Sequence, residues 1–393
     1  MKKYLFVAYF IFSCFIASAS VLSEKANVYL FTCQPGDEIY ATFGHSAFYV
    51  EDEETGVNDV FNYGIFSFDA DNFLYKFLKG DTWYMLGVQD YDYFLWSYAL
   101  RNMGVYAQQL NLTADEKNEL YLALENNALP KNREYLYNFF YDNCATRLRD
   151  MTEKYVDGQL IYSEPTDTHT YRDVVEMFTG RNTWLKFGID ILVGAPADKP
   201  ISNHQKMFLP YFLRDNFAEA VIDRNGEKQP LVLSSEQLIP NFPQESASKL
   251  FSPFAVMCLL LFIAILLSVY DIKRKKYTIW FDVVLFLLAG LIGCLVMFIS
   301  FFSIHPAVFP NYNILWLHPI QLIFAILLCI KRLRPKLYSY HCFNILMLLL
   351  AFMFSLFAQS FNPAFYPLMS VFVVRGATCI YNKRQGAFQG QRI

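Results

Sequence analysis

The stretch Tyr141-Asp142-Asn143-Cys144-Ala145-Thr146-Arg147-Leu148-Arg149-Asp150 is the most informative part of this chain of 393 residues. Asn143 is a good helix N-cap, and the residues from Cys144 to Tyr155 include no glycine or proline, so a helix should begin at Cys144. In the first turn of a helix, unpaired N–H groups and the positive end of the dipole favour the thiolate, the nucleophilic form of cysteine. The backbone N–H groups of residues 144–146 are also suited to hold an oxyanion. The stretch therefore predicts a cysteine nucleophile at a helix start.

A cysteine nucleophile needs a base, and three histidines precede the long apolar segments of the chain: His45, His169 and His204. His45 lies on a predicted strand, and Asn62 or Tyr63 on the next strand is placed to hold its second ring nitrogen. His169 lies among threonines and an aspartate, which is typical of a solvated loop. His45 is therefore the best candidate for the base, although a lone histidine is more often a packed or solvated residue.

The cysteine count leaves a second interpretation open for Cys144. Of eight cysteines, Cys14 lies in an N-terminal apolar stretch and five lie in or beside the long C-terminal apolar segments. Only Cys33 and Cys144 remain between them, and in an oxidising compartment such a pair often forms a disulfide. No histidine, cysteine and aspartate cluster has the spacing of zinc ligands, and the sequence has no glycine-rich phosphate loop, so we expect no cofactor.

The residues around these candidates alternate between strand and helix patterns. Strands are predicted at residues 26–32, 44–50 and 60–63. Helices are predicted at residues 69–79 and 90–102 and from the capping box Thr113-Ala114-Asp115-Glu116. Residues 135–141 fit either a strand or the start of an aromatic helix. The mixture predicts an α+β domain.

The charge of the chain is divided unevenly along its length. Residues 251–393 contain 12 basic and two acidic residues, a net charge of +10, whereas residues 1–250 contain 21 basic and 34 acidic residues, a net charge of −13. The acidic N-terminal part excludes a nucleic-acid binder, because no basic face is available to neutralise phosphates. The long apolar runs of the C-terminal part exclude a wholly soluble enzyme and a disordered chain.

The N-terminus has the pattern of a secretory signal. Met1-Lys2-Lys3 precedes an apolar stretch at residues 4–16, which ends in Ala17-Ser18-Ala19. We therefore expect residues 1–19 to form a signal peptide or a signal anchor, and residues 20–248 to form an exported domain.

Five later segments have about the length and composition needed to cross a bilayer, at residues 251–270, 280–302, 315–330, 341–357 and 365–380. Basic clusters follow the first, third and fifth segments, which places the C-terminus in the cytoplasm by the positive-inside rule. We expect a multi-pass membrane protein, with residues 249–393 as its membrane domain and the exported domain on the outer side. Arg375 in the last segment is expected to snorkel to the cytoplasm, although a charge inside the membrane is also a candidate functional residue. The apolar segment 187–196 fits a membrane-surface helix, an acyl groove or core.

Four motifs carry a resemblance to a known family. Thr32-Cys33-Gln34-Pro35-Gly36-Asp37-Glu38, Phe43-Gly44-His45-Ser46-Ala47, Phe61-Asn62-Tyr63-Gly64 and the stretch 142–150 resemble the Lnb family of bacterial lipoprotein N-acyltransferases. A histidine on an early strand, followed much later by Asn-Cys at a helix start, is also similar to the permuted papain arrangement of NlpC-type proteins and lecithin:retinol acyltransferase. The resemblance covers roughly residues 25–245 and extends to the multi-span tail. It implies an α+β, permuted papain-like domain followed by about five transmembrane helices.

The resemblance implies Cys144 as the nucleophile and His45 as the base of a thiol acyltransferase. An ester-linked acyl chain would move from the diacylglyceryl group of a lipoprotein to its N-terminal cysteine amine through a thioester, leaving a lyso-form lipoprotein. The implied partners are a diacylated lipoprotein and membrane lipid, with no nucleic acid and no cofactor. Supporting roles are expected for Asn62, Tyr63, Asn143, Ala145, Arg147 and Asp150.

Two other functions use the same residues differently. A cell-wall peptidase or amidase of NlpC type would use Cys144 and His45 with water as the acyl acceptor. A non-catalytic envelope protein would join Cys33 and Cys144 in a structural disulfide.

Overall fold

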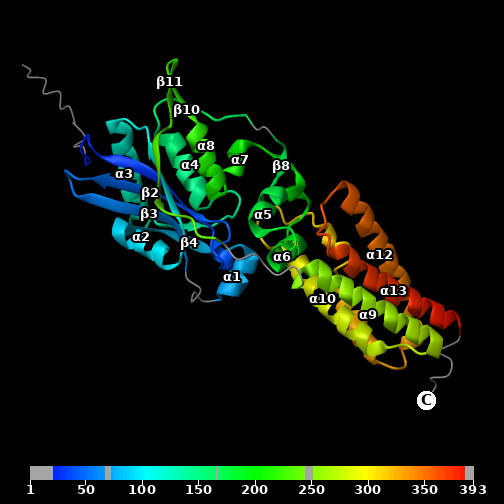
Figure 1. Ribbon diagram of the computed structural model, residues 1–393. Helices are drawn as coiled ribbons and strands as arrows, with labels where there is room; N and C mark the ends of the chain where they lie inside the picture. The colour runs from blue at the N-terminus through cyan, green and yellow to red at the C-terminus, as the bar shows by residue number, and fades with distance from the viewer. Residues whose placement is uncertain (1–20, 67–71, 165–166, 244–250, 386–393) are drawn as a thin grey trace, which may run out of the picture.

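The computed structural model describes residues 21–66, 72–164, 167–243 and 251–385 (Figure 1). The predicted signal at residues 1–19 lies outside these described residues. Within them, sheets and helices alternate up to residue 243, and helices make up the chain from residue 253. The fold class is α+β followed by an all-helical domain, which confirms the prediction.

A seven-stranded sheet in the order β12-β5-β1-β2-β3-β4-β6 forms the centre of the first domain, and its neighbouring strands are antiparallel. Its strands are β1 (Asn27–Cys33), β2 (His45–Asp52), β3 (Val57–Ile65), β4 (Trp83–Asp90), β5 (Val105–Leu110), β6 (Glu134–Leu136) and β12 (Val232–Ile239). Along β1, Val28 and Leu30 enter one buried cluster while Phe31 and Cys33 enter another, because successive side chains of a strand point to opposite faces. Both faces of the sheet are therefore covered.

Helices supply the two covers. On one face lie α3 (Ala114–Ala128), α4 (Cys144–Tyr155) and α8 (Pro210–Glu219), whose buried apolar residues share the cluster of Val28 and Leu30. On the other face α2 (Tyr91–Leu100) buries Phe94 and Tyr98. Burial of this apolar area, worth about 25 cal/mol per Å², holds the layers together.

The chain between α4 and α8 forms small elements beside this sheet. Its helices are α5 (Tyr171–Thr179), α6 (Trp184–Leu192) and α7 (Asn203–Lys206). Its strands are β7 (Gln159–Ile161), β8 (His169–Thr170) and β9 (Pro200–Ile201). The hairpin of β10 (Val221–Arg224) and β11 (Glu227–Pro230) pairs with β7, and β8 pairs with β9.

The predicted elements that fall on described residues are present. The capping box of α3 is complete, since the Thr113 side chain accepts the Glu116 N–H and the Glu116 carboxylate accepts the Thr113 N–H. The predicted helix at residues 69–79 corresponds to α1 (Phe73–Lys79). Residues 135–141, for which two structures were open, form the end of β6 and a bridge between Asn138 and Asp142. The pattern analysis did not predict β4, β5 and β12.

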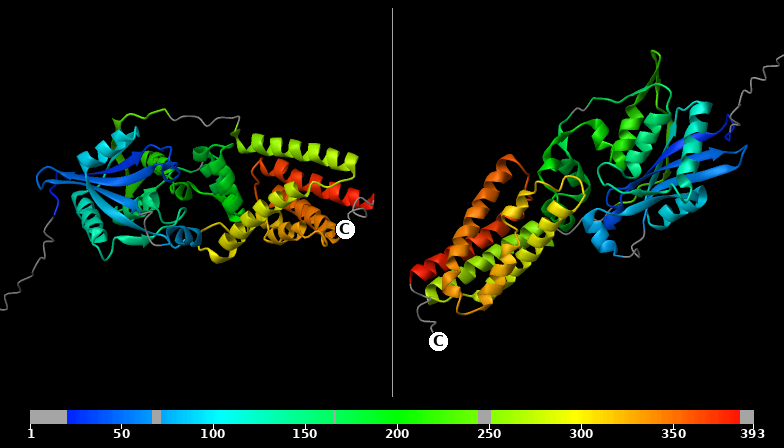
Figure 2. Two further views of the ribbon diagram at one scale, coloured as in Figure 1. Left: turned by 90° about the horizontal axis from the view of Figure 1, so that it is seen from below. Right: turned by 180° about the vertical axis from the view of Figure 1, so that it is seen from behind.

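The second domain is a bundle of long helices, seen side by side in Figure 2: α9 (Pro253–Arg274), α10 (Ile279–Phe302), α11 (Ile320–Cys329), α12 (Tyr338–Phe357) and α13 (Phe365–Arg384). Among the described residues, four helical segments are long and apolar enough to cross a membrane, namely α9, α10, the segment Tyr312–Cys329 and α12. The expected fifth span is a helix of 20 residues, but it is more polar than the other four. Its polar residues Arg375, Thr378 and Asn382 are buried inside the bundle.

The expectation that Arg375 snorkels to the cytoplasm is wrong. Its side chain is fully buried and pairs with Asp282 at 2.7 Å and with Asp271 at 2.9 Å. It also donates to the Ser268 hydroxyl and to the Thr278 carbonyl. These two aspartates are the only acidic residues after position 250. A buried guanidinium with two carboxylates is satisfied where it stands and does not need to reach water.

The helix α6 joins the two domains. Phe187 and Ile191 belong to the buried cluster of the membrane domain, and the Phe187 ring lies 5.2 Å from that of Phe365. The Asn313 side chain donates to the Asp190 carbonyl at 2.8 Å, and that of Asn311 donates to the Ile191 carbonyl at 2.9 Å. The segment 187–196, for which three roles were open, is therefore core at the junction.

Candidate active site

Asn143 and Cys144 begin α4 in the predicted way. The Asn143 side-chain oxygen accepts the N–H groups of Ala145 and Thr146, and the Thr146 hydroxyl accepts the Asn143 N–H. The Asn143 amide nitrogen donates to the carbonyls of Phe139 and Phe208, both at 2.8 Å, which ties the helix start to the neighbouring chain. The backbone N–H groups of residues 144–146 were the three expected oxyanion donors. The Asn143 cap occupies those of Ala145 and Thr146 and leaves that of Cys144 unused.

His45 is the first residue of β2, directly after Gly44. Gly44 has a φ of +75°, and a Cβ there would lie 2.7 Å from the Cys33 carbonyl oxygen, so glycine is needed for this turn into the strand. The His45 Nε2 lies 2.5 Å from the Asn62 Oδ1, and the Asn62 amide donates to Gln89 at 3.0 Å. This leaves Nδ1 as the ring nitrogen that faces Cys144.

Opposite pKa shifts mark Cys144 and His45 as an interacting pair. Burial by itself would raise the pKa of the Cys144 thiol, but the charge and hydrogen bond of His45, with N–H groups of Ser46 and Ala145, lower that pKa below its ordinary value. Burial by itself would lower the pKa of His45, but the charge of Cys144 and hydrogen bonds with Cys144 and Asn62 raise it above its ordinary value. Both shifts favour a thiolate beside an imidazolium.

Gly64 leaves space in front of this pair. Its φ is +101°, in a region that favours glycine, and it lies at a register shift between β3 and β4. A Cβ on Gly64 would lie 3.8 Å from the Cys144 Cβ, 3.9 Å from the His45 Cε1 and 3.9 Å from the Tyr135 hydroxyl. These three groups therefore surround a single point next to the Gly64 backbone.

The other predicted residues divide into two groups. Arg147 lies close to the site, since its guanidinium pairs with Asp142 at 2.6 Å and lies 3.7 Å above the Tyr135 ring. Ala145 is buried in the core beneath it.

Two predicted residues point elsewhere. The Tyr63 hydroxyl bonds with Met151 and Asn127, on the face of the sheet opposite to Asn62. Asp150 is an exposed residue that pairs with Arg149 at 2.6 Å.

Sequence reasoning missed Gln89, Tyr135 and Gly64. Gln89 on β4 contacts Asn62 on β3 diagonally. The residue directly opposite Asn62 is Gly87, and Gln89 lies two residues further along β4 on the same face. The phrase Phe61-Asn62-Tyr63-Gly64 contained a signal for Gly64, because a glycine at a strand end often marks a bulge or a close approach.

Cys33 and Cys144 are both free thiols, as are all the cysteines of the described residues. Cys33 is fully buried against α2, and burial raises its pKa to about 12, so it stays protonated near neutral pH. The two cysteines therefore have different environments, and the structure contains no disulfide between them.

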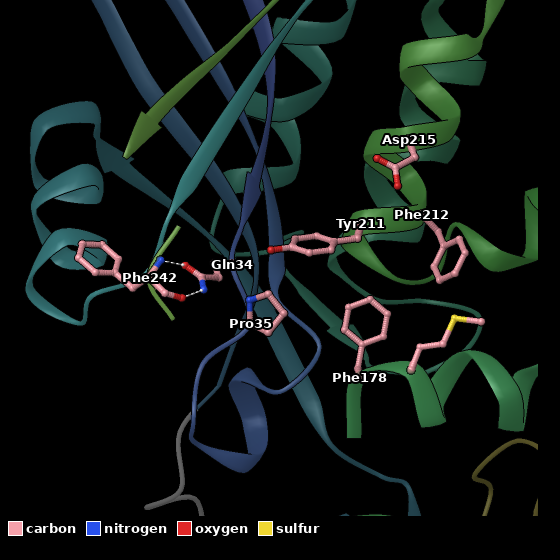
Figure 3. A pocket seen from close by; sticks show the side chains of 8 residues that line it. Gln34, Pro35, Phe178, Tyr211, Phe212, Asp215 and Phe242 are labelled. Atoms are coloured by element: carbon pink, nitrogen blue, oxygen red, sulfur yellow. Dashed lines mark hydrogen bonds between the residues drawn. The ribbon is translucent and has the colours of Figure 1, made fainter. Parts of the chain in front are cut away.

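An aromatic pocket of about 520 Å³ lies beside the strand turn that leads to His45 (Figure 3). It is lined by Gln34, Pro35, Met177, Phe178, Tyr211, Phe212, Asp215 and Phe242. The Gln34 side chain donates to the Phe242 carbonyl at 2.5 Å and accepts its N–H at 2.9 Å, which closes one wall. Phe178 forms another wall and packs against Phe43, two residues before His45. The Phe178 wall of the pocket therefore borders the site.

One group of side chains among the described residues has the geometry to hold a metal ion, namely Asp150, Glu153 and His204. Asp150 is exposed and pairs with Arg149, whereas His204 pairs with Glu153 at 3.0 Å. Within the described part of the chain, no hydrogen bond or ion pair connects this group to Cys144 or His45. The group is separate from the candidate site.

The two domains each match a protein family. The Lnb N-terminal periplasmic domain matches residues 16–176, which include His45, Asn62 and Cys144, and the Lnb transmembrane domain matches residues 244–385. No curated protein and no solved structure matches the chain. The two matches fall on the two domains of the fold in the same order. The chain therefore belongs to the Lnb family, as a membrane protein with a periplasmic N-terminal domain and a transmembrane helical domain.

Proposed function

We propose that this protein is a cysteine-dependent N-acyltransferase of bacterial lipoproteins. The observation that carries the proposal is the Cys144–His45 pair, in which a thiol of lowered pKa lies at a helix start and faces a histidine held by Asn62. This is the arrangement of an activated nucleophile and its base, with a third group that orients the base. The substrate is a diacylated lipoprotein, and the product is an N-acylated lyso-form.

In the first step the Cys144 thiolate attacks the ester carbonyl carbon, and the S–C bond forms as the carbonyl oxygen becomes an oxyanion. The tetrahedral intermediate then loses the glyceryl oxygen, which takes its proton from the His45 imidazolium. The acyl chain remains on Cys144 as a thioester. The raised pKa of His45 suits this step, because the imidazolium must persist until the leaving group needs the proton.

In the second step the α-amino group of the lipoprotein attacks the thioester. The neutral His45 accepts a proton from that amine, the C–N bond forms, and the Cys144 thiolate leaves. Water competes for the same thioester, so the lipoprotein has to stay bound between the two steps. A substrate anchored in the membrane by its acyl chain meets this requirement.

The position of α1 supports a membrane-borne substrate. The chain passes from Gly64 through the end of β3 to α1, and the Ile304 N–H just beyond α10 donates to the Lys79 carbonyl at 2.8 Å. His305 bonds to the Phe77 carbonyl at 2.6 Å. α1 therefore lies at the periplasmic end of a membrane span, and its exposed Leu74 and Tyr75 are available to lipid.

The basic loops support the orientation that this mechanism needs. Basic residues gather at 273–276, 331–336 and 383–384, at the ends of the helices opposite to the periplasmic junction. By the positive-inside rule the proposed location of the C-terminus is the cytoplasm. A periplasmic domain on a helical membrane domain supports a place in the bacterial inner membrane. Membrane lipid and a diacylated lipoprotein are then the partners that the site can reach.

The test is expression of the full chain in a bacterial strain that lacks lipoprotein N-acylation, followed by mass spectrometry of the lipopeptides. We expect the wild type to convert diacyl lipopeptide to the N-acyl lyso-form, and Cys144→Ala and His45→Ala to yield none. Cys33→Ala is the matched control, because it removes the other periplasmic thiol and should retain conversion.

Three results would contradict the proposal. Conversion of the lipopeptide by Cys144→Ala would exclude Cys144 as the nucleophile. If the folded wild type leaves the diacyl lipopeptide unchanged, N-acylation is excluded as the function. Cleavage of murein peptides by the wild type without lipopeptide conversion would favour the peptidase.

A further inference from the structure

The Tyr135 hydroxyl is buried next to the Cys144–His45 pair without a hydrogen-bond partner among the described residues. Tyr135 is the middle residue of β6 and is 5% exposed. Buried tyrosine hydroxyls in folded proteins nearly always find a partner, so an unpaired one beside a reactive thiol points to a ligand.

The hydroxyl faces the space at Gly64 where a reacting group has to lie. A Cβ on Gly64 would meet the Tyr135 oxygen at 3.9 Å, the Cys144 Cβ at 3.8 Å and the His45 Cε1 at 3.9 Å. A carbonyl carbon attacked by the Cys144 sulfur occupies this region, and its oxygen has to point toward a donor.

The ring of Tyr135 is held from several sides, so the direction of its hydroxyl is fixed. The Arg147 guanidinium lies 3.7 Å above the ring and is itself fixed by two bonds to Asp142, at 2.6 and 2.8 Å. Tyr135 also pairs with Tyr84 on β4, and Tyr63 packs edge-on at 6.1 Å. Burial, with the nearby charge of Cys144, raises the pKa of Tyr135, so the hydroxyl keeps its proton.

We infer that the Tyr135 hydroxyl is a catalytic oxyanion donor and forms the oxyanion hole together with the Cys144 N–H. This inference rests on the proposed acyl transfer at Cys144. As the S–C bond forms, the π electrons of the carbonyl move to its oxygen, which accepts hydrogen bonds from Tyr135 and from the Cys144 N–H. Tyr135 transfers no proton. When the intermediate collapses, the C–O bond to the glyceryl group breaks and the proton of His45 goes to that oxygen.

The test compares Tyr135→Phe with the wild type as full-length protein in detergent or lipid nanodiscs. Loss of one oxyanion donor should lower kcat about 10²- to 10³-fold with little change in KM. Alkylation of Cys144 by iodoacetamide should be unchanged, because this reaction forms no oxyanion. Tyr340→Phe is the matched control, since Tyr340 also has a buried hydroxyl without a partner among the described residues but lies on α12.

The outcomes separate the inference from the proposed function. Unchanged kcat in Tyr135→Phe would overturn the inference, because it excludes a catalytic role. A loss of alkylation equal to the loss of kcat would also overturn it, because it indicates a structural role.

A second substrate, a p-nitrophenyl acyl ester, reports thioester formation alone through a Cys144-dependent burst. If the wild type gives that burst but no lipopeptide product, the proposed function fails, and a burst slower by about 10²-fold in Tyr135→Phe still supports the oxyanion role. A burst of unchanged rate in Tyr135→Phe would overturn it.

Discussion

At the scale of single residues, the geometry of His45 distinguishes it from the two other periplasmic histidines. Its Nε2 is bound by Asn62, which is bound in turn by Gln89, so the ring cannot rotate freely and its Nδ1 stays directed at Cys144. His204, by contrast, bonds to Glu153 and is exposed. The position of Cys144 at the N-terminus of α4 and opposite His45 combines a helix end with a cationic partner, and each of these favours the thiolate.

The first prediction concerns the reactivity of Cys144 as a function of pH. The thiol pKa is lowered from 9.0, so thiolate forms at a pH below that value, and the His45 pKa is raised from 6.5, so imidazolium persists above that value. The pair is active as thiolate and imidazolium. Turnover should therefore fall at low pH, where the thiolate is protonated, and at high pH, where the imidazolium loses its proton. In His45→Ala the thiol loses its cationic partner while burial remains, so its pKa should rise. Alkylation near neutral pH should then fall, about tenfold if the thiol pKa rises by about one.

The measurement is the rate of iodoacetamide alkylation of Cys144 at a series of pH values, read by peptide mass spectrometry. Cys33 serves as the internal control, because its pKa of about 12 and its burial keep it unreactive. An alkylation profile of Cys144 that is the same in wild type and His45→Ala would show that the histidine does not activate the thiol.

At the scale of elements, α13 is stable in the bundle because its polar residues are paired. Arg375 binds Asp282 from α10 and Asp271 from α9, so one side chain connects three helices. The Asn382 side chain adds a bond to the Lys276 carbonyl in the loop between α9 and α10. The most polar of the five expected spans is thus held among four apolar helical segments by paired side chains.

Arg375→Met should therefore destabilise the membrane domain strongly. The substitution leaves two buried carboxylates without their partner, and breaking such a network costs about 3–5 kcal/mol. Thermal unfolding of the detergent-solubilised protein should show a markedly lower midpoint than the wild type, and Lys273→Met, an exposed basic residue on α9, is the control. Adding Asp271→Asn and Asp282→Asn to Arg375→Met should recover part of the loss. An unchanged midpoint in Arg375→Met alone would refute the structural role.

At the scale of the whole molecule, a buried polar network fixes the periplasmic domain to the membrane domain. Asp190 on α6 accepts from Arg172 at 2.7 Å, from Lys186 at 2.6 Å and from Asn362 of the membrane domain at 2.9 Å. Arg172 is in turn bound to Asp198 at 2.8 Å. The sheet with Cys144 and His45 therefore has a defined position relative to the membrane helices (Figure 2).

Asp190→Ala should loosen this junction without unfolding the sheet. Removal of the carboxylate leaves the buried Lys186 with only the partly exposed Glu176, at 3.4 Å, and leaves the Asn362 side chain without its acceptor. Weakening the pairing of a buried charge destabilises its surroundings. Hydrogen–deuterium exchange should rise in α6 and in the segment Tyr312–Leu315 while β2 and α4 keep the protection of the wild type.

Lipopeptide conversion should also fall in Asp190→Ala, since the site loses its fixed place above the bilayer. Asp115→Ala, an exposed aspartate on the distant helix α3, is the control. Exchange at α6 equal to that of the wild type would contradict this role of Asp190.

Much of the local structure follows from the sequence alone. The capping boxes of α3 and α4 and the apolar runs of the membrane helices depend on residues within a few positions of one another. The pattern missed β12 because its polar residues face solvent along much of its length, and it pairs with β5 from far along the chain.

The candidate site was predicted only in part, because some of its contacts are local in the chain and others join distant segments. Local patterns are enough to predict that Cys144 begins a helix and that His45 lies on a strand, because caps and side-chain spacing act over a few residues. The folded sheet is needed to see that Asn62 rather than Tyr63 holds His45. Neighbouring residues of a strand point to opposite faces, so the partner depends on which face the histidine occupies. The tertiary structure also decided that Tyr135 faces Cys144 and that Arg375 is paired inside the bundle, because both contacts join segments that the chain brings together only when the sheet and the helices pack.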